Sequence, residues 1–393
     1  MIPHKQCKAR ILHLPHRMTP TLLFALLLLL TTNPSAFAET EPIRHADSLT
    51  LIRGNEGTVV TISNAWDGAP PLRYLLLDRG TELGGQARRK TQEYDGVIEV
   101  PVQRIASLAT PAIAHLADLD ALDRIVAVDK GNYVYNDQIR RLLGEGKIPE
   151  VGNGSSFNLE RLLSVNPELV ILSVLGPDDP TAKRLESVGI SVLPLADWRE
   201  QSPLGRAEWV KLFGELLGVE AEAERVFEPR ASRYRELEAM IDEEARAPGP
   251  TVLTNAPWQG SWPVPAGQSY VARLLEAAGG TYLWAERRGT GSLFLDFEAV
   301  LARGAQADVW VNLNQGWKRR ADALGSDPRL AAFASFRGNQ MYHHNRRVRT
   351  SGANDFWESG ATRPDLVLAD LIHILHPELL PNHDLVYYKR LEP

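Results

Sequence analysis

The sequence has only one cysteine in 393 residues, and its position removes it from most cysteine chemistry. Cys7 precedes an apolar run at residues 22–30, so a cleaved leader would carry it away. The exported chain would then have neither a disulfide nor a thiolate metal site, and Cys7 is misplaced to become a lipid-modified first residue. A disulfide-free exported protein must be stabilised by ordinary hydrophobic cores.

Long apolar runs are also lacking, since residues 22–30 form a stretch too short for a confident membrane span. Four basic residues precede this run, and the small-x-small sequence Ala36-Phe37-Ala38 follows it. These parts predict a secretory signal peptide over residues 1–38, cleaved after Ala38, with an uncleaved anchor as the alternative. No later segment is apolar enough to cross a bilayer, so we expect a soluble, monomeric protein in the periplasm.

Positive charge is in deficit. The chain has 43 Lys and Arg against 49 Asp and Glu, a formal net charge of −6. Cleavage after Ala38 removes four basic residues and no acidic one, which leaves 39 against 49 and a charge of −10. This acidity argues against a nucleic acid as partner.

Catalytic and metal-binding motifs are missing as well. The sequence shows no paired carboxylates, no glycine-rich phosphate loop, no Ser-His-Asp order and no spaced zinc-type cluster. His343 and His344 are adjacent, so on a strand they would point to opposite faces; we expect a solvated basic loop, with a haem ligand as the alternative. His373 and His376 are expected to cap a helix end. We therefore expect neither an enzyme, nor a resident cofactor, nor a bound metal.

What is present is a regular alternation of strand and helix patterns. The continuous apolar run at residues 169–174 is typical of a strand buried on both faces, and Gly54-Asn55-Glu56-Gly57 is typical of a hairpin turn. The pattern predicts an α/β protein with two Rossmann-like lobes joined by a single long helix, preceded by a β-rich extension. The predicted parts are a signal peptide (1–38), an N-terminal extension (39–100), an N-terminal lobe (101–202), a helical connection (203–250), a C-terminal lobe (251–380) and a tail (381–393), which we expect to lie over a surface.

The joining helix is predicted over residues 220–245. Apolar residues recur there at three- and four-residue spacing, with charges between them. Pro229 is expected to kink this helix or to divide it, because proline lacks the amide hydrogen that a helix interior needs.

Several stretches together resemble the periplasmic substrate-binding proteins of ABC importers for ferric siderophores, haem and vitamin B12. They are "QRIASLATPAIAHLADLDALDRIVAVD", "VGNGSSFNLERLLSVNPELVILSV", "EWVKLFGELLGVEAEAERVFE", "SYVARLLEAAGGTYLW" and "LDFEAVLARGAQADVWVNL". The resemblance covers residues 102–375 and implies two lobes that close only modestly on a ligand. The chain departs from the family at His115, where many members carry an acid, and at residues 152–156, which lack the tryptophan of some vitamin B12 binders.

The resemblance also gives a meaning to two glutamates. Glu160 in "FNLERLL" and Glu298 in "LDFEAVL" match the positions at which this family docks onto arginines of a dimeric inner-membrane permease. Without the resemblance, either residue is simply an acid that suits the first turn of a helix.

The expected ligand site lies in loops beyond the carboxyl ends of the strands. Aromatic residues there suit a large flat ligand, and arginines suit an anionic one. We expect Trp310 and Trp357 to be structural. The candidate ligand-binding residues are Tyr133, Tyr135, Asn153 and Ser155 in the first lobe, with Trp258, Trp262, Trp284, Trp317, Arg346 and Arg349 in the second.

These features favour a binding protein that captures an iron chelate of the ferric-siderophore type, or a corrinoid, and delivers it to an ABC permease. Two alternatives stay open. One is an exported enzyme that acts on a chelate or glycan-like ligand in the same cleft. The other is a protein that binds haem or a free metal.

Overall fold

The computed structural model describes residues 43–81, 93–153, 156–174, 176–244 and 248–393. The predicted signal peptide, with Cys7 and Ala38, lies outside the described residues. Thr40–Pro393 form one compact unit. Within the described ranges, no helix combines the length and the apolar character that crossing a bilayer requires.

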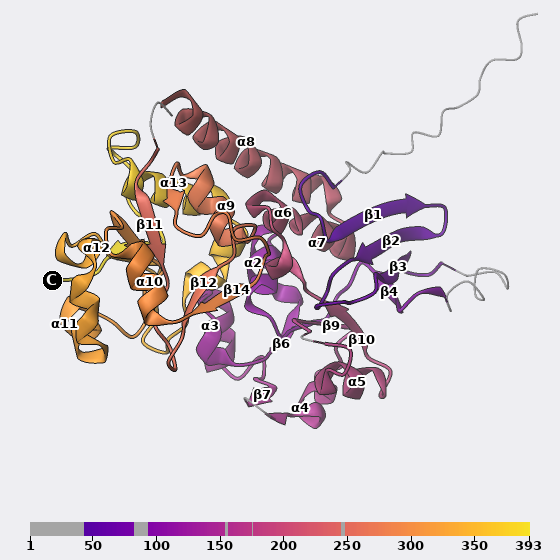
Figure 1. Cartoon of the computed structure of the whole chain (residues 1–393). Coiled ribbons are helices and arrows are strands. Elements are labelled where there is room, and N and C mark those ends of the chain that lie inside the picture. Colours follow the sequence, from indigo (N-terminus) through magenta and orange to yellow (C-terminus); the bar gives the residue numbers. More distant parts are fainter. Residues whose placement is uncertain (1–42, 82–92, 154–155, 175, 245–247) are drawn as a thin grey trace, which may run out of the picture. The chain divides into compact units, whose positions relative to one another are not determined.

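The predicted β-rich extension is a four-stranded sheet in the order β1-β2-β3-β4 (Figure 1). The expected hairpin turn joins β1 and β2, and Gly54 pairs with Gly57. Gly57 has a φ of +130°, and a Cβ atom there would lie 2.0 Å from the carbonyl oxygen of Leu76. Only glycine fits this position without a shift of the backbone. The strands are β1 (Leu49–Gly54), β2 (Gly57–Ile62), β3 (Leu72–Asp78) and β4 (Gly96–Val100), and β4 runs parallel to β3.

The first of two parallel sheets has the strand order β10-β9-β5-β6. Alternate residues of its strands enter two hydrophobic clusters. Ile171 belongs to one cluster, and Val170 belongs to the other. Both faces are therefore buried, as the apolar run predicts. The strands are β5 (Ile105–Ser107), β6 (Ile125–Val128), β9 (Leu169–Leu172) and β10 (Ser191–Pro194), with helices α2 (Thr110–Asp118), α3 (Asp137–Gly144), α4 (Leu159–Ser164) and α5 (Pro180–Glu186) and the short pair β7 (Gly152–Asn153) and β8 (Ser156–Phe157).

Helices α6 (Pro203–Glu208) and α7 (Val210–Leu217) lead into α8 (Glu220–Glu244), a single helix of 25 residues (Figure 1). Its buried side chains include Phe227 and Ala231, as the apolar spacing predicts, and it packs against α7 and α13. The expectation that Pro229 divides the helix is wrong. Pro229 lies on the exposed face, where water can bond the carbonyl that the proline leaves free, while the buried face holds the helix together.

The second parallel sheet follows α8 and has the order β13-β11-β15. A two-stranded antiparallel unit, β12 and β14, accompanies it. Trp262 and Trp310 stack in its core with ring centroids 5.3 Å apart. The elements are β11 (Thr251–Thr254), β12 (Trp262–Pro265), β13 (Thr281–Tyr282), β14 (Ser292–Leu295), β15 (Val309–Val311), α9 (Tyr270–Ala277), α10 (Phe297–Gly304), α11 (Arg320–Ser326), α12 (Ala334–Arg337) and α13 (Pro364–Leu375). The structure is thus an α/β protein with parallel sheets and a long helix between them in the sequence.

The tail does not lie over a surface, contrary to expectation. Tyr387, Tyr388 and Leu391 are buried. Strand β17 (Lys389–Arg390) pairs with β16 (Tyr342–His343), so the end of the chain belongs to the core of the second half. The polar, aromatic sequence gave no periodic signal from which this burial could be inferred.

Candidate ligand-binding cleft

A cavity of about 340 Å³ opens where β5 and β6 end. Ser107 is the last residue of β5, and Asp129 directly follows β6. Gln315 and Asn354, from the second half of the chain, line the same cavity. The carboxyl ends of parallel strands are where ligands bind in open α/β sheets, and residues from both halves meet here.

A second cavity of about 800 Å³ lies beside the ends of β11 and β15, and residues 198–200, which follow β10, also line it. Asn255 and Asn312 each directly follow a strand, and both have left-handed backbones with φ of 61° and 57°. Asparagine tolerates this conformation better than most residues, and the two side chains line the cavity. Trp357 lines both cavities, and we refer to the two together as the cleft.

A hydrogen-bonded group of side chains contributes to the lining of the cleft. The Oδ1 atom of Asn312 accepts from the hydroxyl of Tyr388 at 2.8 Å and lies 3.2 Å from Nδ1 of His344. The other ring nitrogen of His344 lies 3.3 Å from Nε2 of Gln315. Burial raises the pKa of Tyr388 well above its ordinary value, so its phenol stays a hydrogen-bond donor. The group therefore fixes the floor of the cleft in one geometry.

The expectation of a solvated basic loop at His343 and His344 is wrong for both histidines. Each ring is buried, and that of His344 packs against Phe356 at 4.4 Å between centroids. Burial lowers the pKa of His343 to about 4 and that of His344 to about 3, so both are neutral at physiological pH. Among the described residues, no group of three or more His, Cys, Asp or Glu is arranged to hold a metal ion.

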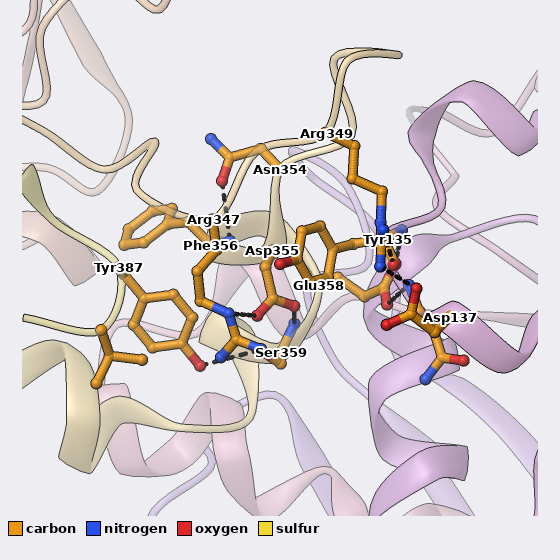
Figure 2. A network of polar contacts seen from close by, with 12 residues as sticks. Tyr135, Asp137, Arg347, Arg349, Asn354, Asp355, Phe356, Glu358, Ser359 and Tyr387 are labelled. Carbon is orange, nitrogen blue, oxygen red and sulfur yellow. Dashed lines mark hydrogen bonds and ion pairs between the residues drawn. The ribbon is translucent and has the colours of Figure 1, made fainter. Parts of the chain in front are cut away.

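Residues 349–358 of the second half form hydrogen bonds with residues 131–137 of the first half. We call this contact the clamp. Figure 2 shows Arg349 and Glu358 directed at Tyr135. The carboxylate of Glu358 accepts the backbone N–H groups of Tyr135 and Asn136 at 2.8 and 2.9 Å. Arg349 donates to the carbonyl of Tyr135 at 2.7 Å and to Asp137 at 2.6 Å. The clamp holds the two sides of the smaller cavity together.

The clamp should make the stability of the protein depend on pH. Burial raises the pKa of Glu358 from 4.5 to about 7. The stabilisation from a carboxyl with a raised pKa is fully present below the pKa of that group in the unfolded chain. It is lost as the pH rises through the pKa of the group in the folded protein. We expect the free energy of unfolding to fall by up to about 3 kcal/mol between pH 4.5 and 7.5 through this group alone. Urea unfolding of the wild type and of Glu358→Gln across this range measures the difference; parallel curves for the two proteins would contradict it.

The residues predicted for the ligand fall into different environments. Tyr133 is 57% exposed and lines the smaller cavity. Trp258 is 60% exposed but lines neither cavity of the cleft. Trp262, Trp284 and Trp317 are buried in the core of the second half and offer a ligand no accessible ring. Trp262 and Trp317 pack around Trp310 and Phe333, and Trp284 packs against Tyr282, so the tryptophans of the second half serve its core.

The predicted polar residues also differ from one another. The guanidinium of Arg349 is engaged in the clamp, to which Tyr135 contributes its backbone N–H and carbonyl. Arg346 is exposed and outside both cavities. Ser155 lies outside the described residues, as does the side chain of Asn153. The arginines that the sequence analysis assigns to an anionic ligand are therefore not placed in the cleft.

Several cleft residues were missed by the sequence analysis. Trp357 was expected to be structural, yet it is 47% exposed and lines both cavities. Trp198 is 41% exposed at the rim of the larger cavity. Trp198 follows shortly after a buried strand, and this position could have placed it in the cleft from the sequence. Tyr388 enters the cleft from the tail, and nothing in the sequence near it indicates that position.

The charges that line the cleft balance one another. The smaller cavity has Asp129 and Lys130, and the larger one has the acids Asp67 and Glu200 with the bases Arg199 and Arg206. Because His344 is neutral, the lining carries no formal net charge. A strongly anionic ligand would therefore find no excess of positive charge to compensate its own.

Glu160 and Glu298 occupy equivalent places at the starts of α4 and α10. Each is the second residue of its helix, after an Asn158 or Asp296 cap whose side chain accepts a backbone N–H. Both side chains are exposed. Glu298 pairs with Arg329 at 2.9 Å, whereas Glu160 makes no hydrogen bond or ion pair within the described part of the chain. The structure thus presents two similarly built acidic positions, one before and one after α8.

The family model described as "Periplasmic binding protein" matches residues 105–347, more than half of the chain. The protein belongs to this family, which confirms the resemblance, and it is a binding protein and not an enzyme. The extension and the end of the chain lie outside the matched residues.

Individual relatives are more distant. An uncharacterized lipoprotein of Methanocaldococcus jannaschii is 27% identical over 355 residues, which are 86% of this chain and 83% of the relative. A periplasmic heme binding protein from Pseudomonas aeruginosa shares the fold with a TM-score of 0.56 and 21% identity, over 74% of this chain and 99% of that one. The periplasmic vitamin B12 binding protein BtuF of Vibrio cholerae does so with a TM-score of 0.51 and 14% identity, over 72% and 99%.

Proposed function

We propose that this protein is the periplasmic solute-binding component of an ABC importer, and that it carries a metal chelate of low net charge. The observation that carries the proposal is the cleft itself. It crosses the carboxyl ends of strands from both parallel sheets, is walled by both halves, and presents aromatic surface with a balanced lining charge. Its two cavities, of about 340 and 800 Å³, suit a ligand larger than a bare metal ion.

Within this class, the lining charge favours a neutral ferric trihydroxamate or a corrinoid. A ferric triscatecholate carries three negative charges, but neither of the two arginines predicted for an anionic ligand is available in the cleft. Arg346 lies outside it, and Arg349 is part of the clamp. An uncompensated buried charge costs several kcal/mol, on the order of the binding energy of a micromolar ligand. A neutral iron chelate and a corrinoid are therefore the ligands that we propose, and an anionic chelate is disfavoured.

Haem is a second candidate, on one observation. Tyr133 is exposed at the smaller cavity, and a tyrosine oxygen is a known axial ligand of ferric haem. The amine of Lys130 lies 5.2 Å from the centroid of that ring, close enough to meet a propionate. If the protein binds haem through Tyr133, the Soret band of the complex shifts in Tyr133→Phe. If it binds a chelate without using Tyr133, the affinity of this variant for the chelate equals that of the wild type.

Delivery to the permease is proposed to use Glu160 and Glu298, since both are exposed and similarly placed. We place the mature protein in the periplasm after cleavage at Ala38. Two relatives from Methanocaldococcus jannaschii are named lipoproteins. A lipoprotein carries its lipid on a cysteine that follows the apolar run. The one cysteine of this sequence, Cys7, precedes the run.

The exposed ring of Trp357 should contribute directly to ligand affinity. We expect Trp357→Ala to weaken binding of the chelate by about 10-fold, because an aromatic contact with a flat ligand contributes on the order of 1.5 kcal/mol. Trp258→Ala is the matched control, since Trp258 is more exposed but lies outside both cavities. Isothermal titration of both variants with cyanocobalamin and with ferrichrome, a ferric trihydroxamate, makes the comparison. Equal losses in the two variants would remove Trp357 from the site.

A further inference from the structure

The N-terminal sheet reaches the cleft through the loop between β2 and β3, residues 63–71. Asp67 in this loop lines the larger cavity, and its side chain is 96% exposed. The loop lies outside the family match, which begins at residue 105. Part of the lining of the cleft therefore comes from a segment outside the residues that the family model matches.

The loop is held rigidly behind its exposed tip. Ala65 is buried, and Trp66 packs against both hydrophobic clusters of the first parallel sheet. The N–H of Ser63 donates to the carbonyl of Ser48 at 2.8 Å, and that of Ala69 to the carbonyl of Trp66 at 3.0 Å. Asp67 is thus the one acidic residue of a fixed turn, and it lines the larger cavity.

Two buried carboxylates fasten the start of the described chain to the body of the protein. Glu200 accepts the backbone N–H groups of Asp47 and Ser48 and the indole N–H of Trp209. Glu208 accepts the backbone N–H groups of Arg44, His45 and Ala46. Because Glu200 directly follows Trp198 and Arg199, the extension is anchored where the rim of the larger cavity is built.

Asp67, Trp198 and Arg199 form one rim of the larger cavity. Arg199 pairs with Asp67 and donates to Asn64 at 3.1 Å, and its guanidinium carbon lies 5.1 Å from the ring centroid of Trp198. The arginine is therefore committed to the protein, while the Asp67 carboxylate keeps free lone pairs and the Trp198 ring keeps an open face. The lining of the larger cavity also includes small, neutral residues: Ser269, Thr290, Gly291 and Ser292.

We propose that Asp67 and Trp198 form a second subsite of the cleft, which binds a neutral amide-bearing arm of the ligand. An amide N–H donates to the Asp67 carboxylate, and the flat amide face rests on the Trp198 ring. A carboxylate arm is disfavoured, because it would meet Asp67 without a free cation. Corrin side chains and cyclic-peptide hydroxamate siderophores both offer such amides. This inference rests on the proposed function and deepens it, since it assigns the N-terminal sheet to ligand selection.

The test is isothermal titration of the full mature protein with three probes: cyanocobalamin and ferrichrome, which carry amides, and haemin, which carries carboxylates. For the amide probe that binds, we expect Asp67→Ala to weaken affinity about 10-fold and Trp198→Ala about fivefold. Asp67→Asn keeps an acceptor and should lose less than Asp67→Ala. The matched controls are Asp123→Ala, an exposed aspartate also paired with an arginine, and Trp258→Ala; both should stay within about twofold of wild type.

The outcomes separate the subsite from the proposed function. Binding of cyanocobalamin or of ferrichrome, with the losses above, supports the subsite and identifies its source of amides. Binding of an amide probe with unchanged affinity in Asp67→Ala and Trp198→Ala overturns the subsite and leaves the proposed function standing. Binding of haemin alone overturns the amide assignment. Binding of none of the three overturns both proposals.

Discussion

Replacing Glu160 and Glu298 together by alanine is expected to reduce ligand uptake by whole cells at least about 30-fold while the affinity of the purified protein stays unchanged. Truncating one partner of a close interfacial charge pair typically costs 2–5 kcal/mol, and here two such pairs would be lost. Uptake is measured with radiolabelled ligand in cells that express the wild type or the variant, and affinity by titration. Each single variant should retain part of the uptake.

The geometry explains why both carboxylates would be needed. Each projects from the first turn of a short helix, beside a capping Asn158 or Asp296, so its backbone is fixed. Helix α8 is not divided at Pro229 and packs on helices from both halves, which favours a constant separation of the two positions. To dock, Glu298 would have to release Arg329 and bind a permease arginine. One ion pair between arginine and carboxylate would then replace another. Two fixed carboxylates can address two basic sites of a dimeric partner at once.

The control is Glu236→Ala with Glu276→Ala, since both residues are exposed glutamates that pair with an arginine on their own helix. Uptake in this double variant should equal that of the wild type. If the Glu160 and Glu298 variant also imports ligand at the wild-type rate, these residues are ordinary helix-start acids and the docking assignment is lost.

Local periodicity explains the parts of the fold that could be predicted. The apolar run at residues 169–174 and the spacing of Phe227 and Ala231 each report a face that is buried by neighbours of any identity. Such patterns need no knowledge of the partner. The parallel sheets, the long helix and the N-terminal sheet follow from them, and the family match confirms the class.

The cleft could be predicted only as a set of loops, because side-chain environment there depends on contacts distant in sequence. Nothing local in the sequence separates Trp262 from Trp357, yet the first is enclosed by Phe297, Trp310 and Phe333, and the second lines both cavities. Arg349 was a reasonable ligand residue until its partner Asp137, 212 positions earlier, was known. Burial and pairing of this kind have no local signature.

The tail shows the same limit and leads to the second large effect. Asp370 on α13 is fully buried and holds three consecutive backbone N–H groups of the tail, those of Val386, Tyr387 and Tyr388, at 2.8, 2.6 and 2.9 Å. It also lies 2.7 Å from the ring nitrogen Nε2 of His383. One carboxylate thus fixes the segment that delivers Tyr388 to Asn312 in the cleft.

Asp370→Ala is therefore expected to lower the free energy of unfolding by about 3–5 kcal/mol, because several buried donors lose their acceptor at once. Affinity for the chelate should fall as well, since Tyr388 would no longer be held against Asn312. Urea unfolding followed by circular dichroism measures the first effect, and titration under conditions where the variant remains folded measures the second.

Asp365→Ala is the matched control on the same helix. Asp365 is also buried, but its carboxylate pairs with the side chain of Arg363 and binds none of the tail N–H groups that Asp370 holds. The substitution Asp365→Ala should lower the free energy of unfolding by less than Asp370→Ala does. It should leave ligand affinity unchanged, because the tail stays in place. A loss below about 1 kcal/mol in Asp370→Ala would show that water replaces the carboxylate, and the tail would then be secured by the burial of Tyr387 and Tyr388 alone.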